Sequence, residues 1–393
     1  MIAAQPLGRL AFTRPIKILA FLSVAGAAAI VWRFAAGLGA STALNDGYPW
    51  GLWIAFDVVT GTALACGGYA VALLVYVFNR GQYHPLIRPA IVTSALGYTM
   101  AGISVALDVG RPYGIWKVPL YFWSWNLNSA LLEVALCIMA YTLVVWLELA
   151  PAVLERWRDQ PGSRFRALAT RLTPRVDRSL TWIIALAMLL PTMHQSSLGT
   201  LMVLSGPRLH ELWQTVWLPL LFLISCLSMG FAAVVIEGTL AHFVLKRPLE
   251  RAMFANLAKV VVPLQAAYIL LRLGDVVARG VFASAWQPTA FAFLFWLELA
   301  LFAAPIVMLR GRADSARLFR SAMVLVVGGA LYRFDTFLVA FQPGAHYSYF
   351  PSVGELLVTT GLVSMEILAY ILIIHYFPIM SGAHHATAEK AGV

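Results

Sequence analysis

SLTWIIALAMLLPTMHQSSLGTL, residues 179–201, is long enough to cross a membrane as one helix, yet polar side chains lie near its middle. About 20 apolar residues span the roughly 30 Å hydrocarbon core of a bilayer. Residues 179–190 are almost entirely apolar, whereas Pro191, His194 and Gln195 follow directly. Polar groups inside lipid are expensive and usually face the protein interior. The stretch therefore predicts a membrane helix with a polar inner face.

The rest of the chain has the composition of a polytopic membrane protein. Of its 393 residues, 61% are hydrophobic and only 12% are charged. A soluble domain contains about twice that charged fraction. Apolar segments that are long enough to span a bilayer cover residues 16–38, 50–78, 88–109, 126–149, 179–203, 214–243, 251–273, 288–309, 316–341 and 352–377. We therefore predict an all-α integral membrane protein with ten transmembrane helices.

The distribution of positive charge predicts the orientation of these spans. With the N-terminus in the cytoplasm, most of the 28 Lys and Arg residues fall in cytoplasmic segments. This arrangement follows the positive-inside rule, so the net charge of +10 does not indicate nucleic-acid binding. The longest cytoplasmic connection, residues 150–178, is basic and is expected to lie on anionic lipid headgroups. Both termini are then predicted to be cytoplasmic.

The predicted outer loops are rich in aromatic residues. One of them, DVGRPYGIWKVPLYFWSWNLNS at residues 108–129, contains three of the 13 tryptophans. An aromatic belt would place tryptophan at both membrane boundaries, whereas here the outer boundary holds most of it. We interpret this face as a surface for a partner protein or as a pocket for a flat hydrophobic ligand.

Ionisable side chains occur at several depths within the predicted spans, where each costs about 2.5–3.5 kcal/mol on insertion scales. They are Asp57, Glu133, His194, Glu237, Lys259, Glu298, Arg333, Asp335 and Glu366. Arg333 and Asp335 lie on different faces of one span, so each is expected to form an ion pair with another helix. Lys259, Glu298 and Glu366 could belong to a second polar path.

Some of these groups form a ladder when they are ordered by depth. Glu237 lies nearest the cytoplasmic end, Tyr98 and His194 lie near mid-membrane, and Glu133 and Asp57 lie nearest the outer end. A proton relay requires groups that gain and lose protons and that are separated by gaps which water can bridge. We predict such a relay, provided that the helices concerned touch. Gln195 and its neighbouring serines could hold water around His194, or could bond adjacent helices instead.

The histidines and cysteines argue against metal cofactors in this chain. A haem b with two histidine ligands needs two imidazoles at matching depth, and only His194 lies centrally. The other histidines lie in loops, in the tail or at helix ends: His84, His210, His242, His346, His375, His384 and His385. The cysteines Cys66, Cys137 and Cys226 lie in separate spans. We therefore predict no haem and no iron–sulfur cluster.

Several stretches resemble the NrfD/polysulfide-reductase-C family of quinone-interacting membrane subunits. They are PWGLWIAFD (49–57), DVGRPYGIWKVP (108–119), LLEVALCIMAY (131–141), PTMHQSSLGTL (191–201), VVIEGTL (234–240) and YFPSVGELLVTTGL (349–362). Together they are similar to the branch of the family that anchors periplasmic NiFe hydrogenases in the bacterial inner membrane. Members of that branch are often called cytochrome b subunits although they carry no haem.

The resemblance implies two related four-helix bundles, in residues 50–203 and 214–341, with additional spans at 16–38 and 352–377. It implies that Tyr98, Glu133, His194 and Glu237 support proton movement. It also implies a quinone site, for menaquinone or ubiquinone, toward the outer end of the first bundle. Its pocket or rim is expected to include Asp57, Asp108, Arg111, Trp125 and Asn126.

The partners that the resemblance implies are a ferredoxin-like iron–sulfur subunit and the small and large hydrogenase subunits, all on the periplasmic side. The chain is then one subunit of a hydrogen:quinone oxidoreductase. Two alternatives stay open. A sulfur- or nitrite-compound oxidoreductase could supply the electrons instead, or the chain could be a secondary transporter with broken helices.

Overall fold

The computed structural model describes residues 6–380 apart from residues 9, 161, 246–250 and 311–313. Within these residues, ten helices are long and apolar enough to cross a membrane, which confirms the predicted all-helical, multi-pass architecture. The spans are Arg14–Ala36, Trp53–Val77, Gly81–Asp108, Ala130–Asp159, Arg166–Leu204, Leu218–Leu245, Ala252–Ala278, Ala290–Met308, Ser315–Val339 and Val353–Tyr376. His384 and His385 lie outside the described residues.

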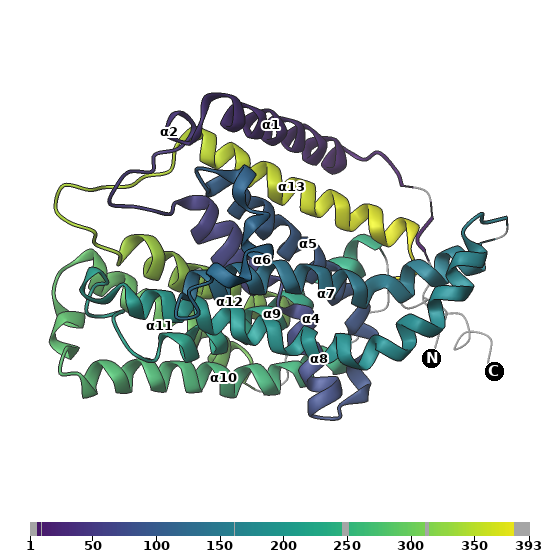
Figure 1. Ribbon diagram of the computed structural model, residues 1–393. Helices are drawn as coiled ribbons and strands as arrows, with labels where there is room; N and C mark the ends of the chain where they lie inside the picture. The colour runs from purple at the N-terminus through teal and green to yellow at the C-terminus, as the bar shows by residue number, and fades with distance from the viewer. Residues whose placement is uncertain (1–5, 9, 161, 246–250, 311–313, 381–393) are drawn as a thin grey trace.

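Figure 1 shows the arrangement of the spans, most of which are single α-helices. Some spans combine α-helical and π-helical turns. The α-helical elements are α1 (Arg14–Ala36), α2 (Leu38–Ser41), α3 (Gly61–Leu64), α4 (Gly67–Ala72), α5 (His84–Asp108), α6 (Lys117–Leu120), α7 (Ala130–Asp159), α8 (Arg166–Leu204), α9 (Leu218–Leu245), α10 (Arg251–Ala278), α11 (Ala290–Met308), α12 (Ser315–Phe334) and α13 (Val353–Tyr376). Wider π-helical turns form η1 (Trp53–Thr60), η2 (Leu73–Val77) and η8 (Asp335–Val339).

The helices pack largely against their neighbours in sequence. The helix α7 lies along α8, α9 contacts both α10 and α12, and α11 contacts α10 and α12. The helix α5 packs against η1, α4 and α7, and α9 also contacts α3, α4 and α8. The division into two four-helix bundles and the cytoplasmic position of both termini remain predictions.

The first and last spans form a pair on one flank of the molecule. Figure 1 shows α1 and α13 side by side, and α13 also contacts α5 and η1. At their crossing, a Cβ atom on Gly26 would lie 2.5 Å from the Cα atom of Gly361. Small residues let membrane helices approach closely, so glycine at both positions allows this contact.

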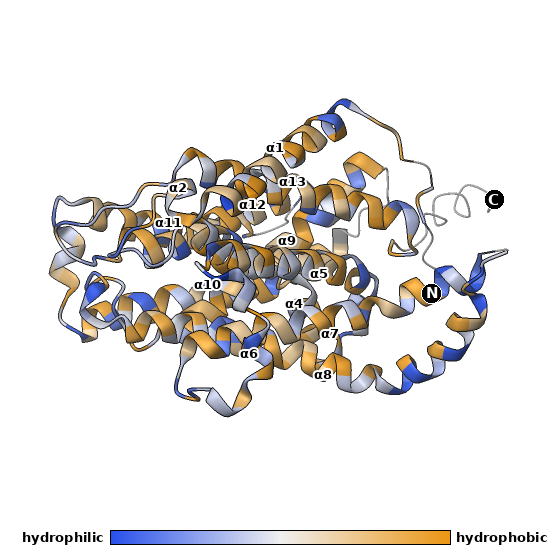
Figure 2. Cartoon of the chain, turned by 45° about the horizontal axis from the view of Figure 1, so that its top comes forward, coloured by the Kyte–Doolittle hydropathy of each residue, from blue (hydrophilic) through white to orange (hydrophobic). Residues whose placement is uncertain are grey.

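The helix α8 is longer than a bilayer is thick. Its 39 residues extend over about 58 Å at 1.5 Å per residue. The antiparallel pair α7–α8 therefore projects beyond the other helices, and Figure 2 shows hydrophilic residues gathered on this projection. The basic connection predicted at residues 150–178 is largely helical, and α8 continues through Pro174 and Pro191.

Candidate functional site

One acidic side chain and two hydroxyl groups lie together where η1, α5 and α13 meet, near the predicted outer end, and a second acidic side chain follows one turn farther along α5. Asp57 on η1 is only 7% exposed, and Thr359 on α13 donates a hydrogen bond of 3.0 Å to its Oδ2 atom. Ser104 on α5 lies beside Asp57, and Asp108 follows one helical turn later. We call Asp57, Ser104, Asp108 and Thr359 the acidic cradle.

The acidic cradle contains polar atoms without a partner among the described residues. Ser104 Oγ and Asp108 Oδ1 are buried and make no hydrogen bond there. Buried polar atoms in proteins are nearly always satisfied by protein, water or ligand. These two atoms could therefore bind a polar group that enters the cradle.

An apolar wall borders the acidic cradle. It consists of the fully buried Trp53, Leu107, Val358 and Leu362, with Met100 and Met365 packed against them. The Trp53 ring is fixed because its Nε1 atom donates to the Glu355 carbonyl at 3.2 Å. Polar groups that converge beside an apolar surface are typical of small-molecule sites.

Arg33 closes the acidic cradle from α1. Its Nε atom donates to the Leu107 carbonyl at 2.7 Å and its Nη2 atom to the Val109 carbonyl at 2.8 Å. The guanidinium is also close enough to Asp108 to interact electrostatically. Arg33 is absent from our sequence-based predictions, because a lone arginine near a span end usually reports only topology.

Tyr349, in the loop before α13, positions the start of that helix. Its hydroxyl donates to Glu355 Oε1 at 2.5 Å and accepts from the Leu52 amide at 2.6 Å. Burial raises the pKa of the Tyr349 hydroxyl, so the group stays protonated and acts as a donor. This contact ties α13 to the residue that precedes η1.

A second acidic group lies farther along α13, near the predicted cytoplasmic end. The Tyr370 hydroxyl donates to Glu237 Oε1 on α9, and Thr93 on α5 donates to Glu237 Oε2 at 3.2 Å. Three helices therefore meet at the Glu237 carboxylate. Sequence analysis predicted Glu237 but neither of its donors, since depth alone does not show which helices touch.

Glu366 lies between these two acidic sites on the same face of α13. A Cβ atom on Gly97 would lie 3.3 Å from Glu366 Oε1, so glycine leaves room for this carboxyl group. Glu366 is also close enough to Asp57 to interact electrostatically. The spacing of Thr359, Glu366 and Tyr370 by seven and four residues places them on one helix face. We call these three residues the polar face of α13.

Tyr98 and His194 form a pair in the protein interior. Both are fully buried, and the Tyr98 hydroxyl lies 3.2 Å from His194 Nδ1. Gln195 Nε2 donates to Thr62 Oγ1 at 3.0 Å and lies 3.4 Å from the same imidazole nitrogen. His194 Nε2 has no partner among the described residues. The pair makes no hydrogen bond there to Glu237 or Asp57.

The other predicted site residues lie toward the predicted outer surface. Glu133 is in the first turn of α7, because that helix begins at Ala130, and its carboxylate makes no hydrogen bond among the described residues. Trp125 is half-buried, and its Nε1 atom donates to the Val118 carbonyl at 2.7 Å. Arg111 and Asn126 are exposed in the loop between α5 and α7.

Arg333 and Asp335 do not form the expected ion pairs. Arg333 donates to the Val59 carbonyl at 2.8 Å, to the Phe222 carbonyl at 3.0 Å and to Ser225 Oγ at 3.2 Å. Asp335 is only 1% exposed, and neither carboxylate oxygen has a hydrogen-bond partner among the described residues. The prediction was wrong because carbonyls of η1 and α9 replace an acid beside Arg333.

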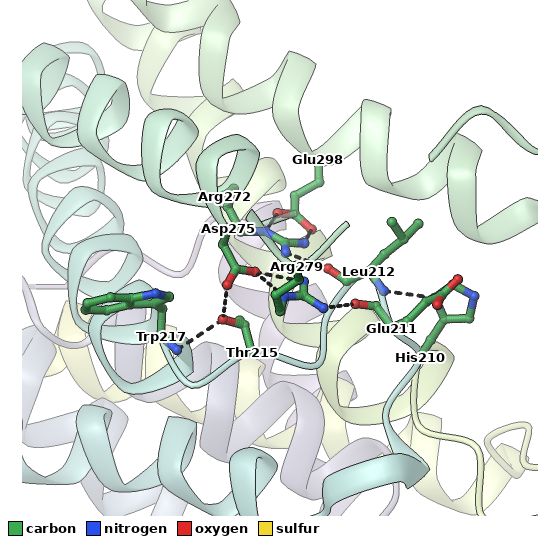
Figure 3. A network of polar contacts seen from close by, with 9 residues as sticks. All are labelled: His210, Glu211, Leu212, Thr215, Trp217, Arg272, Asp275, Arg279 and Glu298. Atoms are coloured by element: carbon green, nitrogen blue, oxygen red, sulfur yellow. Dashed lines mark hydrogen bonds and ion pairs between the residues drawn. The ribbon is translucent and has the colours of Figure 1, made fainter. Parts of the chain in front are cut away.

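A separate network joins α10, α11 and the loop before α9 (Figure 3). Arg272 and Glu298 are fully buried and form a two-point ion pair with N–O distances of 3.0 and 3.2 Å. Tyr268 donates to Glu298 at 2.7 Å and Trp213 donates to it at 3.0 Å. Lys259 lies elsewhere, because it is exposed and donates to Asn256 at 2.9 Å.

The described histidines do not fit a haem with two imidazole ligands. His194 is central, whereas His84, His242 and His375 lie at or near helix ends and His210 and His346 lie in loops. Nδ1 of His194 is already engaged by Tyr98 and Gln195. Within the described residues, no three His, Cys, Asp or Glu side chains are grouped to hold a metal ion.

The comparisons with known proteins agree on one family. The model of the family described as "Polysulphide reductase, NrfD" matches residues 40–342. A "Probable Ni/Fe-hydrogenase 2 b-type cytochrome subunit" of Escherichia coli is 42% identical over 386 residues, covering 96% of this chain and 95% of the relative. A "Menaquinone reductase, integral membrane subunit" of Nitratidesulfovibrio vulgaris is 27% identical over 374 residues, covering 88% and 86%.

A further relative from Nitratidesulfovibrio vulgaris is 33% identical over 379 residues, covering 92% of this chain and 93% of the relative. The similarity to the Escherichia coli subunit extends over nearly the whole chain, and the family model covers the spans from η1 to η8. The chain therefore belongs to the polysulphide reductase NrfD family.

Proposed function

We propose that this chain is the quinone-reducing membrane subunit of a hydrogen-oxidising complex in the bacterial inner membrane. The similarity to a subunit named for a Ni/Fe hydrogenase supports the electron donor, and the relative named a menaquinone reductase supports the acceptor. The acidic cradle is the observation that carries the proposal, since it combines unpartnered polar atoms with an apolar wall.

The quinone head group binds in the acidic cradle. Its carbonyl oxygens accept from Ser104 Oγ and from a protonated carboxyl of Asp57 or Asp108. Its apolar tail runs along the wall of Trp53, Val358 and their neighbours. Both menaquinone and ubiquinone have this combination of two carbonyl oxygens and a long apolar chain.

Quinone reduction consumes two electrons and two protons. The electrons come from a ferredoxin-like iron–sulfur subunit, and the hydrogenase small and large subunits lie beyond it on the periplasmic side. The exposed aromatic loop between α5 and α7 supports this docking position, because Trp116 is 52% exposed and Trp123 is 69% exposed. Large exposed aromatic side chains commonly mark protein interfaces.

The protons travel along the polar face of α13. Glu237 receives a proton at the predicted cytoplasmic end and is connected to Tyr370 by a hydrogen bond. Glu366 lies between Tyr370 and the acidic cradle, where Asp57 is the final donor to the quinone. Positioned acids that exchange protons with a reacting group accelerate such steps. Uptake from the cytoplasm would store membrane potential at each turnover.

Reconstitution of the complex tests this proposal. The chain is purified with its native partners and inserted into vesicles that contain menaquinone or ubiquinone, and hydrogen-dependent quinone reduction is measured. Asp57→Asn and Ser104→Ala are expected to lower this rate and to raise the quinone concentration needed for half-maximal rate. The matched control is Ser364→Ala, because Ser364 is also buried on α13 but bonds only the Thr360 carbonyl of its own helix.

Two results would contradict the proposal. A complex that reduces quinone at the native rate after both cradle substitutions would place the quinone elsewhere. If the chain purified with a sulfur- or nitrite-converting enzyme rather than with a hydrogenase, that enzyme would be the electron donor. The proposed hydrogenase partner would then be wrong, whereas the proposed quinone site would not be affected.

A further inference from the structure

A set of buried polar side chains lies between α10 and α12, away from the acidic cradle and the polar face of α13. It comprises Ser321 and Tyr332 on α12, Gln265 on α10, and Asp335 at the start of η8. All four are at most 3% exposed. Ser321 Oγ, both polar atoms of Gln265, the Tyr332 hydroxyl and both Asp335 oxygens have no hydrogen-bond partner among the described residues.

The set begins at a cavity near the predicted cytoplasmic end. Four helices, α9 to α12, line this cavity of about 30 Å³, and Ser321 is its hydroxyl-bearing side chain. A cavity needs only about 10–15 Å³ of such volume to hold a water molecule. The cavity therefore has room for about two water molecules, and the place for them is at its Ser321 end, because the other lining side chains are apolar.

The other residues of the set follow the cavity along α10 and α12, toward the predicted outer end. Val261 lines the cavity, and Gln265 lies one turn farther along the same buried face of α10, about 6 Å away. On α12, Leu325 lines the cavity and Tyr332 follows two turns later, about 10 Å away. With about 2.8 Å between hydrogen-bonded oxygens, about one water molecule bridges the first of these rises and about three bridge the second.

The next residues of the set, Tyr332 and Asp335, lie near Arg272 and Glu298, which belong to the network in Figure 3. The Tyr332 ring packs edge-on against Tyr268 with 5.4 Å between ring centres, and the Arg272 guanidinium lies 5.9 Å from the Tyr332 ring. Asp335 is close enough to Glu298 and Arg272 to interact electrostatically. Glu298 is held by its ion pair and by two further donors, whereas Asp335 has no such bonds and can gain or lose a proton.

We propose that Ser321, Gln265, Tyr332 and Asp335 line a water-filled route for protons between α10 and α12, separate from the quinone-linked route along α13. Water satisfies the unpartnered atoms along the route, and Asp335 carries a proton in the resting protein because neither of its oxygens accepts a hydrogen bond from the described residues, while the neighbouring Arg272 is engaged by Glu298. The Arg272–Glu298 pair joins α10 to the neighbouring helix α11 beside the route.

Infrared spectroscopy tests whether the route contains water. The complete complex in vesicles is expected to show a protonated carboxyl band that is missing in Asp335→Asn. In D2O this band is expected to shift rapidly in the native complex and about tenfold more slowly in Gln265→Leu, which removes one bridging group. Thr239→Val is the control, because Thr239 is also buried nearby but bonds the Val235 carbonyl of its own helix.

Charge movement during turnover tests whether the route carries protons. Asp335→Asn is expected to keep hydrogen-dependent quinone reduction while moving less charge per quinone reduced, and Ser321→Ala to have a smaller effect in the same direction. The inference is overturned if no band is lost in Asp335→Asn, if the band exchanges equally fast in Gln265→Leu, or if charge movement is unchanged. If the native complex did not reduce quinone, this result would instead contradict the proposed function. The exchange measurement does not require quinone reduction, so it would still test the route.

Discussion

Tyr370 on α13 donates a hydrogen bond to Glu237 on α9. A side chain of α13 therefore holds a carboxyl group of a helix that lies more than 100 residues earlier in the sequence. Thr93 on α5 donates to the same carboxylate. The helix α13 therefore bonds a buried carboxyl group in addition to packing against α1. In the relay that we propose, protons pass from Glu237 along α13 toward the acidic cradle and not through His194.

Removal of the Tyr370 hydroxyl should slow proton delivery. In Tyr370→Phe, Glu237 keeps Thr93 but loses its donor on α13, and loss of one such bond corresponds to about tenfold in rate. We expect hydrogen-dependent quinone reduction to fall by about this factor with little change in the amount of folded complex. Tyr376→Phe is the control, since Tyr376 is 55% exposed near the end of the same helix. Equal rates in both variants would exclude Tyr370 from the route.

A comparison of two carboxyl groups distinguishes the polar face of α13 from the ladder that depth alone predicts. Glu366 lies on that face near Asp57, whereas Glu133 lies in the first turn of α7 without a hydrogen bond among the described residues. We expect Glu366→Gln to reduce field generation in vesicles strongly and Glu133→Gln to reduce it little. The opposite result would restore Glu133 as a member of the relay.

The buried ion pair of Figure 3 should be important for stability. Arg272→Leu leaves the Glu298 carboxylate buried without its cation, and breaking such a pair costs about 3–5 kcal/mol. We expect a marked drop in the unfolding temperature of the purified chain in detergent. Arg158→Ala provides the comparison, because the Arg158–Asp159 pair is exposed and such pairs contribute about 0–1 kcal/mol. A similar unfolding temperature in both variants would contradict a structural role for Arg272.

The crossing of α1 and α13 should not tolerate larger side chains. Leucine at Gly361 would meet the backbone of Gly26, so the two helices would have to separate. We expect Gly361→Leu to lower both stability and quinone reduction, because α13 carries groups of both sites. Gly39→Leu tests the specificity of this effect, since a Cβ atom at Gly39 has no neighbour within 4 Å. The measurements are the unfolding temperature and the rate of hydrogen-dependent quinone reduction.

The sequence predicted the spans well, because each crossing needs a long apolar segment whatever its neighbours are. It also indicated Asp57, Glu237 and His194, since charged or titratable groups inside lipid stand out. It could not show their partners. Tyr370 and Thr93 are ordinary residues until the contacts of α13, α9 and α5 are known. The π-helical turns at Asp57 and Asp335 likewise have no sequence pattern that we could recognise.

The predicted ion pairs of Arg333 and Asp335 illustrate the same limit. Charge alone suggested a partner of opposite sign on another helix. The fold instead supplies Arg333 with carbonyl groups, one of them Val59 in the π-helical η1. The fully buried ion pair between Arg272 and Glu298 joins a predicted residue to one that the sequence analysis passed over.

The helix α13 follows the spans of Asp57 and Glu237 in the sequence, and this order determines when their contacts can form. Ribosomes release the N-terminal spans first, so Glu237 and Asp57 enter the bilayer before Tyr370, Glu366 and Thr359 have been translated. A nascent or prematurely terminated chain therefore lacks the connection between its two acidic sites. Only a chain translated through α13 can give Asp57 and Glu237 the hydroxyl donors that this helix supplies in the folded protein.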